Sequence, residues 1–144
     1  MINPAITIEQ ISAPKNNMVT HLGIEFTEIG KDFLCGKMPV DQRTIQPMGI
    51  LHGGASVVLA ETLGSVASVC CVDITKQYVV GLEINANHIK SVRAGNWVYG
   101  KATAIHIGRK THIWEIRITN EENKLICISR ITMAIMDIVK KDEK

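Results

Sequence analysis

The segment from Ile45 to Val72 restricts the possible folds of this chain more than any other part of the sequence. Its only side chains that can carry a charge near neutral pH are His52 and Glu61, and its other side chains are apolar or small. A helix that is apolar or small nearly all round is a buried helix, so we expect a long buried helix from Gly53 to Val72. An unpaired carboxylate in such a helix would cost several kcal/mol. Glu61 is therefore either exposed by the packing or kept at this position for chemistry.

The spacing of His52 and Glu61 indicates a site that two subunits share. Glu61 follows His52 by nine positions. In an α-helix that separation is roughly 13 Å along the axis and about half a turn around it. Two such side chains cannot meet within one chain, so we predict a homodimer in which His52 of one subunit faces Glu61 of the other. The alternative is that His52 only caps the helix and Glu61 points into solvent.

Length and charge fit one globular domain that covers residues 1–144 and ends in a charged, frayed tail at 140–144. A chain of 144 residues is long enough for a hydrophobic core. The net charge is +2 and no arginine-rich run is interleaved with aromatic residues, so nucleic acid is not an expected partner. The long apolar segment could almost cross a bilayer, but Glu61 at its centre and its many Ser and Gly residues argue against a membrane span.

The cysteines are expected to be reduced, packed thiols. Cys35, Cys70, Cys71 and Cys127 form no Cys-x-x-Cys pair and no other metal-ligand spacing, so no metal site is predicted. Free thiols are typical of a cytoplasmic protein. Acids and prolines stand near the N-terminus, where a secretory signal would need a basic end and an apolar run. We therefore expect a cytoplasmic location.

The rest of the chain is rich in β-prone stretches. We expect strands at residues 21–28, 33–40, 78–88, 97–107, 111–120 and 124–137. The first two should be joined by a hairpin turn at 30–32. Thr7 and Gln10 form a capping-box pattern, which predicts a short helix at 7–12, and residues 16–20 should form a turn. Two strands, one long helix and four strands make an α+β fold, in which an antiparallel sheet of five to six strands wraps around one central helix.

Several segments together resemble a known family. Gln46, the run His52–Ser56 and the run Leu59–Ser65 resemble the core motif of hotdog-fold acyl-CoA thioesterases. Further similar segments are His21–Ile24, Met38–Asp41, Val80–Ala86 and His106–Arg109. The resemblance covers most of residues 18–135. Within the family, the chain is similar to the group that holds phenylacetate-type thioesterases, 1,4-dihydroxy-2-naphthoyl-CoA hydrolases and the proofreading thioesterases of enterobactin synthesis.

The resemblance implies a catalytic role for each matching residue. Glu61 would be the nucleophile or the general base for water. The backbone N–H of Gly53, at the positive end of the helix, would bind the thioester oxygen as charge builds on it. His52 and Gln46 would position and polarise the thioester from the same subunit as Gly53. Ser65, one helical turn after Glu61, would orient the carboxylate or the water; the alternative is a small residue needed for close packing.

The resemblance also implies a site for coenzyme A. Residues that match its contact positions are Gly81, His88, Ile89, Lys90, Ser91, His106, Ile107, Gly108, Arg109, Lys110 and Thr111. Gly108 would permit a tight turn, and the basic side chains would bind the phosphates. The alternative is that the basic residues are ordinary solvated surface. Coenzyme A would be part of the substrate, so no separate cofactor is expected.

The implied function is the hydrolysis of an acyl-CoA thioester, with an aromatic acyl group such as 1,4-dihydroxy-2-naphthoyl. An acyl carrier protein is an alternative donor, because it presents the same pantetheine arm as coenzyme A. Shared sites imply a homodimer. We expect a homotetramer, and the sequence leaves open whether two such dimers join and by which faces. Two other functions remain open: a non-catalytic acyl-CoA-binding protein, and a hotdog dehydratase or hydratase. The Asp-x-x-x-x-His signature of the hydratases is absent.

Overall fold

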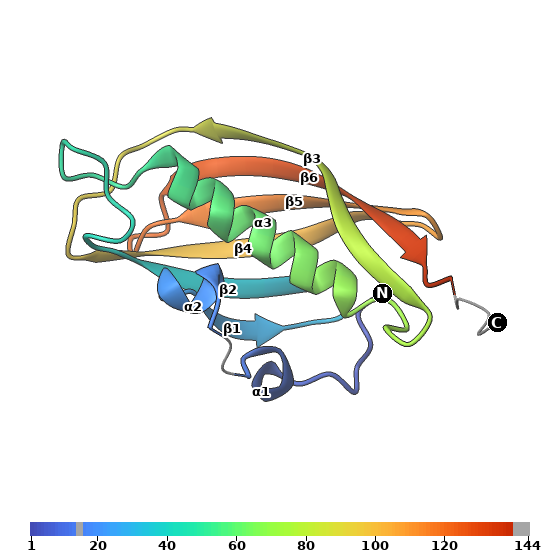
Figure 1. The fold of residues 1–144 in the computed structure, drawn as a ribbon. Helices are drawn as coiled ribbons and strands as arrows, with labels where there is room; N and C mark the ends of the chain where they lie inside the picture. Colours follow the sequence, from blue (N-terminus) through green and yellow to red (C-terminus); the bar gives the residue numbers. More distant parts are fainter. Residues whose placement is uncertain (14–15, 140–144) are drawn as a thin grey trace.

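The computed structural model describes residues 1–13 and 16–139, and it consists of a six-stranded antiparallel sheet with one long helix across one face (Figure 1). The strand order is β1-β2-β4-β5-β6-β3. The elements are α1 (Ile8–Ile11), α2 (Met18–His21), β1 (Glu25–Ile29), β2 (Phe33–Val40), α3 (Gly53–Val69), β3 (Gln77–His88), β4 (Asn96–Ile107), β5 (Thr111–Thr119) and β6 (Leu125–Asp137). The expected α+β plan is confirmed. The predicted frayed tail at 140–144 lies outside the described residues.

The sheet packs against α3 through alternating side chains. Trp114, Ile116 and Ile118 of β5 are fully buried on the face toward α3, as the two-residue period of a strand requires. The indole Nε1 of Trp114 donates a hydrogen bond of 2.7 Å to Ser68 Oγ of α3. Gly100 of β4 makes room for the helix, because a Cβ on it would lie 2.6 Å from Leu63. The helix therefore lies close to the backbone of the sheet.

The C-terminal end of α3 comes earlier in the chain than the sequence predicted. It begins at Gly53 as expected but ends at Val69, not at Val72. The last turn tightens because the N–H of Cys71 donates to the carbonyl of Ser68. The carbonyl of Val69 accepts from the N–H of Val72, and that of Cys70, just past the helix, accepts from the N–H of Asn3, 2.9 Å away, so the N-terminal segment closes the end of the helix. Within the described ranges, no helix has both the length and the hydropathy needed to cross a bilayer.

Two predictions near the N-terminus were wrong. Residues 16–20 were expected to be a turn and 21–28 a strand, but α2 occupies positions 18–21 and β1 begins only at Glu25. Asn17 starts α2, since its side chain accepts from two backbone N–H groups of the first turn in a capping box. Gly23, with φ of +70°, turns the chain away after the helix. The predicted helix at 7–12 and the hairpin between β1 and β2 are confirmed.

The two edges of the sheet differ. β1 forms one edge and runs beside α1 and α2 (Figure 1). β3 forms the other edge over twelve residues, and no described strand pairs with its outer side. Tyr78, Val80 and Leu82 of β3 are exposed apolar side chains. An open edge with apolar side chains is a ready partner for another strand.

The four cysteines are free thiols that are buried or partly buried, as the sequence predicted. All four are unpaired, and Cys70 and Cys127 are buried. Burial raises the pKa of the Cys70 thiol to about 11, with a smaller contribution from Cys71. Burial likewise raises the pKa of Cys35, Cys71 and Cys127. The four side chains are therefore neutral thiols at pH 7.

Candidate active site

A groove of about 320 Å³ opens at the N-terminal end of α3. Six residues that the sequence proposed for the site line it: Gln46, Gly53, His88, Ile89, Lys90 and Ser91. Four others that the sequence did not point to also line it: Ile50, Leu51, Ser56 and Ile126. The groove thus joins the loop before α3 to the end of β3, two segments far apart in the sequence.

The start of α3 leaves one backbone donor free in this groove. The backbone of His52 is extended, and its Nδ1 accepts the N–H of Gly54 at 2.8 Å. His52 is therefore a helix cap, as the alternative reading proposed. The N–H of Gly53 makes no hydrogen bond with any described residue. A free N–H at the positive end of a helix is suited to an oxygen that gains negative charge.

Gln46 and His88 flank that free donor. A Cβ on Gly53 would lie 2.8 Å from Nε2 of His88, so the imidazole rests directly on the Gly53 backbone. Gln46 shapes the loop before the helix: its side-chain oxygen accepts from the N–H of Met48, and its carbonyl accepts from Gly49. Gly49 has φ of +74°, a conformation that favours glycine. The amide nitrogen of the Gln46 side chain has no hydrogen-bond partner among the described residues.

Glu61 lies in the middle of α3 and is partly buried. Its Oε1 accepts a hydrogen bond of 3.2 Å from Ser65 Oγ, one turn later in the helix. A Cβ on Gly81 of β3 would lie 2.8 Å from the same Oε1. The carboxylate is therefore held between its own helix and the open edge of the sheet. The contact between Glu61 and Ser65 has the geometry that the sequence suggested, while the catalytic role of both residues remains a prediction.

One chain does not bring the candidate residues into a single site. Gly53 and Glu61 are separated by about 12 Å along α3. His88 pairs with Cys127 at one end of β6, and Thr111 pairs with Ala134 toward the other. Seven residues of extended strand span roughly 23 Å. The proposed coenzyme A segment 106–111 therefore lies far from the groove of its own chain.

The turn after β4 is built around Gly108. Its N–H donates to the carbonyl of Thr111 at 2.9 Å, and a Cβ on it would clash with Nε2 of His106. Lys110 is already engaged, since its Nζ lies 2.6 Å from Oδ2 of Asp137. That contact, with a hydrogen bond from Gln77, holds the pKa of Asp137 below its usual value.

The adjacent residue Arg109 is exposed and forms no ion pair with the described residues. Ile107, in contrast, is half-buried, because its side chain packs against the core. Arg109 is thus the side chain of this turn that remains available for an anion.

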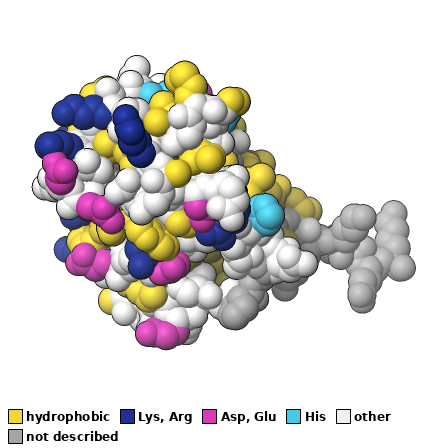
Figure 2. Space-filling view, turned by 90° about the vertical axis from the view of Figure 1, so that its left-hand side faces the viewer, with side chains coloured by type: hydrophobic (Ala, Val, Ile, Leu, Met, Phe, Trp, Pro, Cys, Tyr) yellow, Lys and Arg dark blue, Asp and Glu magenta, His cyan; other side chains and the backbone are white. Residues whose placement is uncertain are grey.

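The end of the molecule near the groove carries charges of both signs. Figure 2 shows that dark-blue Lys and Arg side chains gather toward one edge of this end, with acidic side chains beside them. Lys90 is exposed next to the groove and helps to lower the pKa of Glu122, after the larger effect of Lys124. The exposed ion pair between Lys124 and Glu122 contributes little to stability, so Lys124 is free to exchange its partner for a phosphate. Lys90 forms no ion pair with the described residues.

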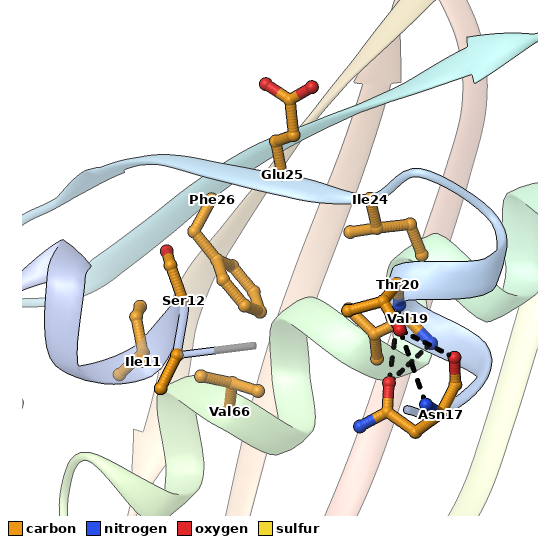
Figure 3. A pocket seen from close by; sticks show the side chains of 10 residues that line it. Ile11, Ser12, Asn17, Val19, Thr20, Ile24, Glu25, Phe26 and Val66 are labelled. Atoms are coloured by element: carbon orange, nitrogen blue, oxygen red, sulfur yellow. Dashed lines mark hydrogen bonds between the residues drawn. The ribbon is translucent and has the colours of Figure 1, made fainter. Parts of the chain in front are cut away.

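A second hollow, of about 400 Å³, lies between α1, α2, β1 and α3 (Figure 3). Phe26 and Val66 point into it from opposite sides (Figure 3). Its polar end is occupied by the start of α2, where Asn17 Oδ1 accepts from the N–H groups of Val19 and Thr20. None of the described residues that line it is a candidate site residue. We assign this hollow to the packing of the N-terminal segment.

Comparison with known proteins gives consistent matches over nearly the whole chain. The model of the thioesterase superfamily matches residues 48–127. A 1,4-dihydroxy-2-naphthoyl-CoA hydrolase of Escherichia coli is 52% identical over 132 residues, which are 91% of this chain and 96% of that protein. A proofreading thioesterase of Cronobacter turicensis is 46% identical over 132 residues, 91% of this chain and 95% of that protein.

Solved structures match the fold. The crystal structure of a mutant thioesterase from Pseudomonas aeruginosa superposes with a TM-score of 0.91 at 48% identity, covering 95% of this chain and 99% of that one. A thioesterase from Haemophilus influenzae superposes with a TM-score of 0.88 at 45% identity, covering 99% of both chains. The expected hotdog architecture, a sheet around one long helix, is confirmed.

Proposed function

Because this chain belongs to the thioesterase superfamily, we propose that it hydrolyses acyl-CoA thioesters, with an aromatic acyl group such as 1,4-dihydroxy-2-naphthoyl as the preferred substrate class. The observation that carries this proposal lies in α3. The helix holds a free N–H at Gly53 and, further along, a half-buried carboxylate at Glu61. The substrate name of the Escherichia coli relative supports the aromatic acyl group. Four neutral thiols are consistent with a cytoplasmic enzyme.

The open edge of β3 supports a two-fold dimer. On this strand, Gly81 lies against Glu61, and His88 lies against Gly53. If two β3 edges pair antiparallel about an axis at Asn85, the bulge between Gly81 and Glu83 brings Gly81 of one subunit opposite the partner's His88. Glu61 of one subunit then faces the partner's Gly53. The pairing would also cover the exposed apolar side chains of the edge and satisfy its unpaired backbone groups.

The same pairing brings the two proposed coenzyme A segments toward each other. Thr111 lies beside Ala134 across the sheet, and Ala134 lies beside Val80. In this dimer Val80 would face the partner's Ile89. Three strand spacings, about 14 Å, would then separate the turn of one subunit from the groove of the other. Coenzyme A is long enough to cover that distance, so Arg109 and the partner's Lys90 would both be within reach of its phosphates.

The chemistry follows from this arrangement. The thioester oxygen would accept the hydrogen bond of Gly53, with His52 and Gln46 of the same subunit orienting the carbonyl. Glu61 of the partner subunit would act in one of two ways. As general base it would take a proton from water, whose oxygen attacks the carbonyl carbon, and pass that proton to the departing thiolate. As nucleophile it would form an anhydride that water then hydrolyses. Both routes release a carboxylic acid and the free thiol of coenzyme A.

A panel of thioesters tests the proposal. We expect free thiol release from benzoyl-CoA and 1,4-dihydroxy-2-naphthoyl-CoA, with kcat/KM about tenfold or more above that for acetyl-CoA and straight-chain acyl-CoA. The assay detects free thiol with a chromogenic disulfide, and the same acyl groups on an acyl carrier protein identify the carrier. Tight binding without thiol release over hours would instead indicate a non-catalytic acyl-CoA-binding protein. Release of water from a hydroxyacyl-CoA would indicate a dehydratase.

A further inference from the structure

The hydroxyl of Ser56 is a buried polar group to which the proposed reaction assigns no role. Ser56 lies near the start of α3, and only 2% of its surface is exposed. Its Oγ makes no hydrogen bond with any described residue. Burial of a hydroxyl without a partner is unfavourable, because the group gives up its hydrogen bonds to water. An alanine would fit the same place without this cost, so the hydroxyl indicates a ligand.

Other hydroxyls of the core are used differently. In the described part of the chain, three of them are at most 3% exposed and each has a partner within the protein: Thr44, Ser68 and Ser129. Ser68, on the same helix as Ser56, accepts from the indole of Trp114. Thr62 is the other buried hydroxyl without a hydrogen bond to a described residue, but it is 8% exposed and does not line the groove. Ser56 thus combines deep burial, an unpaired hydroxyl and a place in the groove.

The Ser56 hydroxyl opens into the groove at the N-terminal end of α3, where Ser56 is one of the lining residues. Among the enclosed side-chain nitrogen and oxygen atoms of the described residues, only Nδ1 of His112 lacks a hydrogen bond. Ser56 Oγ also lacks one, so it is not enclosed and reaches the groove. Ser56 shares the sheet-facing stripe of the helix with three fully buried residues: Leu59, Ala60 and Leu63. It is therefore a polar end to an apolar helix face.

Two free donors lie close together on this part of α3. The N–H of Gly53 is one, and the hydroxyl of Ser56, three residues later, is the other. Residues three apart lie on the same face of a helix at roughly 5–6 Å, and helix side chains lean toward the N-terminus. One acceptor atom about 3 Å from each donor would therefore bind both. The positive end of the helix favours an acceptor that gains negative charge.

We propose that the hydroxyl of Ser56 donates a hydrogen bond to the same thioester oxygen that the N–H of Gly53 binds, which makes Ser56 a further catalytic residue. The proposal rests on the proposed function, because it assumes a thioester carbonyl in this groove. A hydrogen bond that strengthens as charge builds on the oxygen stabilises the transition state more than the bound substrate. Loss of the hydroxyl should therefore change kcat more than KM.

For Ser56→Ala we expect kcat for benzoyl-CoA to fall about tenfold or more, with KM within about twofold. The N–H of Gly53 remains and limits the loss. The unfolding temperature should rise by about 2–4 °C, because the variant removes an unpaired hydroxyl and alanine favours a helix. Benzyl-CoA, a thioether that lacks the carbonyl oxygen, should bind both proteins with Kd values within about twofold, measured by calorimetry.

Ser68→Ala is the matched control, since it removes a buried hydroxyl of the same helix that already has a partner in Trp114. It should lower the unfolding temperature and leave kcat within about twofold. Parental kcat in Ser56→Ala would overturn the catalytic role. So would a fall in its unfolding temperature to that of Ser68→Ala, which would indicate a structural hydroxyl, or a higher Kd for benzyl-CoA, which would place the hydroxyl at another part of the ligand.

Binding separates a failure of this proposal from a failure of the proposed function. If the parent protein hydrolyses no thioester, the proposed function is wrong, and the Kd of benzoyl-CoA then decides the role of Ser56 as a ligand of the carbonyl oxygen. Weaker binding of benzoyl-CoA but not of benzyl-CoA by Ser56→Ala would support that contact, and equal values for both would overturn it. If the parent protein binds neither compound, both proposals are wrong.

Discussion

Replacing Glu61 with Gln is expected to lower kcat for aroyl-CoA hydrolysis by about 10³-fold, the usual contribution of a positioned base or nucleophile. The amide is neutral, so it neither attacks the carbonyl nor accepts a proton from water. Its size is the same, and it keeps an oxygen that accepts from Ser65. Stability should therefore change by less than about 1 kcal/mol, because a half-buried carboxylate is replaced by an uncharged group. Steady-state kinetics and thermal unfolding measure the two effects.

Glu115→Gln is the matched control for this experiment. Glu115 is also partly buried, but it lies between the buried residues Trp114 and Ile116 and so points to the face of the sheet away from α3. Its substitution should leave kcat within about twofold. If Glu61→Gln retains the parental rate, the chemistry assigned to this helix is wrong. A parallel collapse of stability in both variants would point to folding as the cause.

A single methyl group at Gly81 should be nearly as damaging as the loss of the carboxylate charge. In Gly81→Ala the new Cβ would lie 2.8 Å from Oε1 of Glu61, so the flexible end of that side chain has to move. Displacement of the reacting group by about 1 Å is enough for a loss of about 10²-fold in kcat. The fold should persist, because the neighbour that must shift is a side-chain terminus, and the gel-filtration mass should not change.

A double substitution separates this effect from general damage to the strand. If Gly81→Ala acts through Glu61, adding it to Glu61→Gln should lower kcat by less than about twofold more, since residues that act as a unit are not additive. Independent losses that multiply would mean that the methyl group disturbs the strand edge and not the carboxylate. Parental activity of Gly81→Ala would show that the carboxylate does not work from the position it has in this structure.

The fold was largely predictable because its signals are local. The apolar helix, the alternation in β5 and the Thr7–Gln10 capping box each appear within a few consecutive residues, and each is present in the structure. The helix α2 was missed although Asn17 and Thr20 form a capping box as well. A helix of four residues has no room for an apolar period, so only its cap could have indicated it.

The sequence singled out several residues that line the candidate groove, but it did not indicate the other residues that line it. Gln46, Gly53 and His88, which the family resemblance singled out, line one groove, and their roles remain predictions. Ile126 lines it because the carbonyl of this residue accepts from the N–H of Ile89, 2.7 Å away, a contact between strands far apart in the sequence. No local sequence pattern predicts a contact between two segments so far apart in the chain. The ion pair between Lys110 and Asp137 is hidden in the sequence for the same reason.

A mixture of two inactive variants tests the shared site most directly. One variant carries Glu61→Gln, and the other carries Gln46→Ala together with His52→Ala, so each homodimer lacks one half of both sites. Co-expressed in equal amounts, half of the dimers contain one subunit of each kind, and each of these has one intact site. We predict recovery of about a quarter of the parental activity. If each chain held a complete site of its own, every site would carry a defect, and the mixture would be as inactive as its two components.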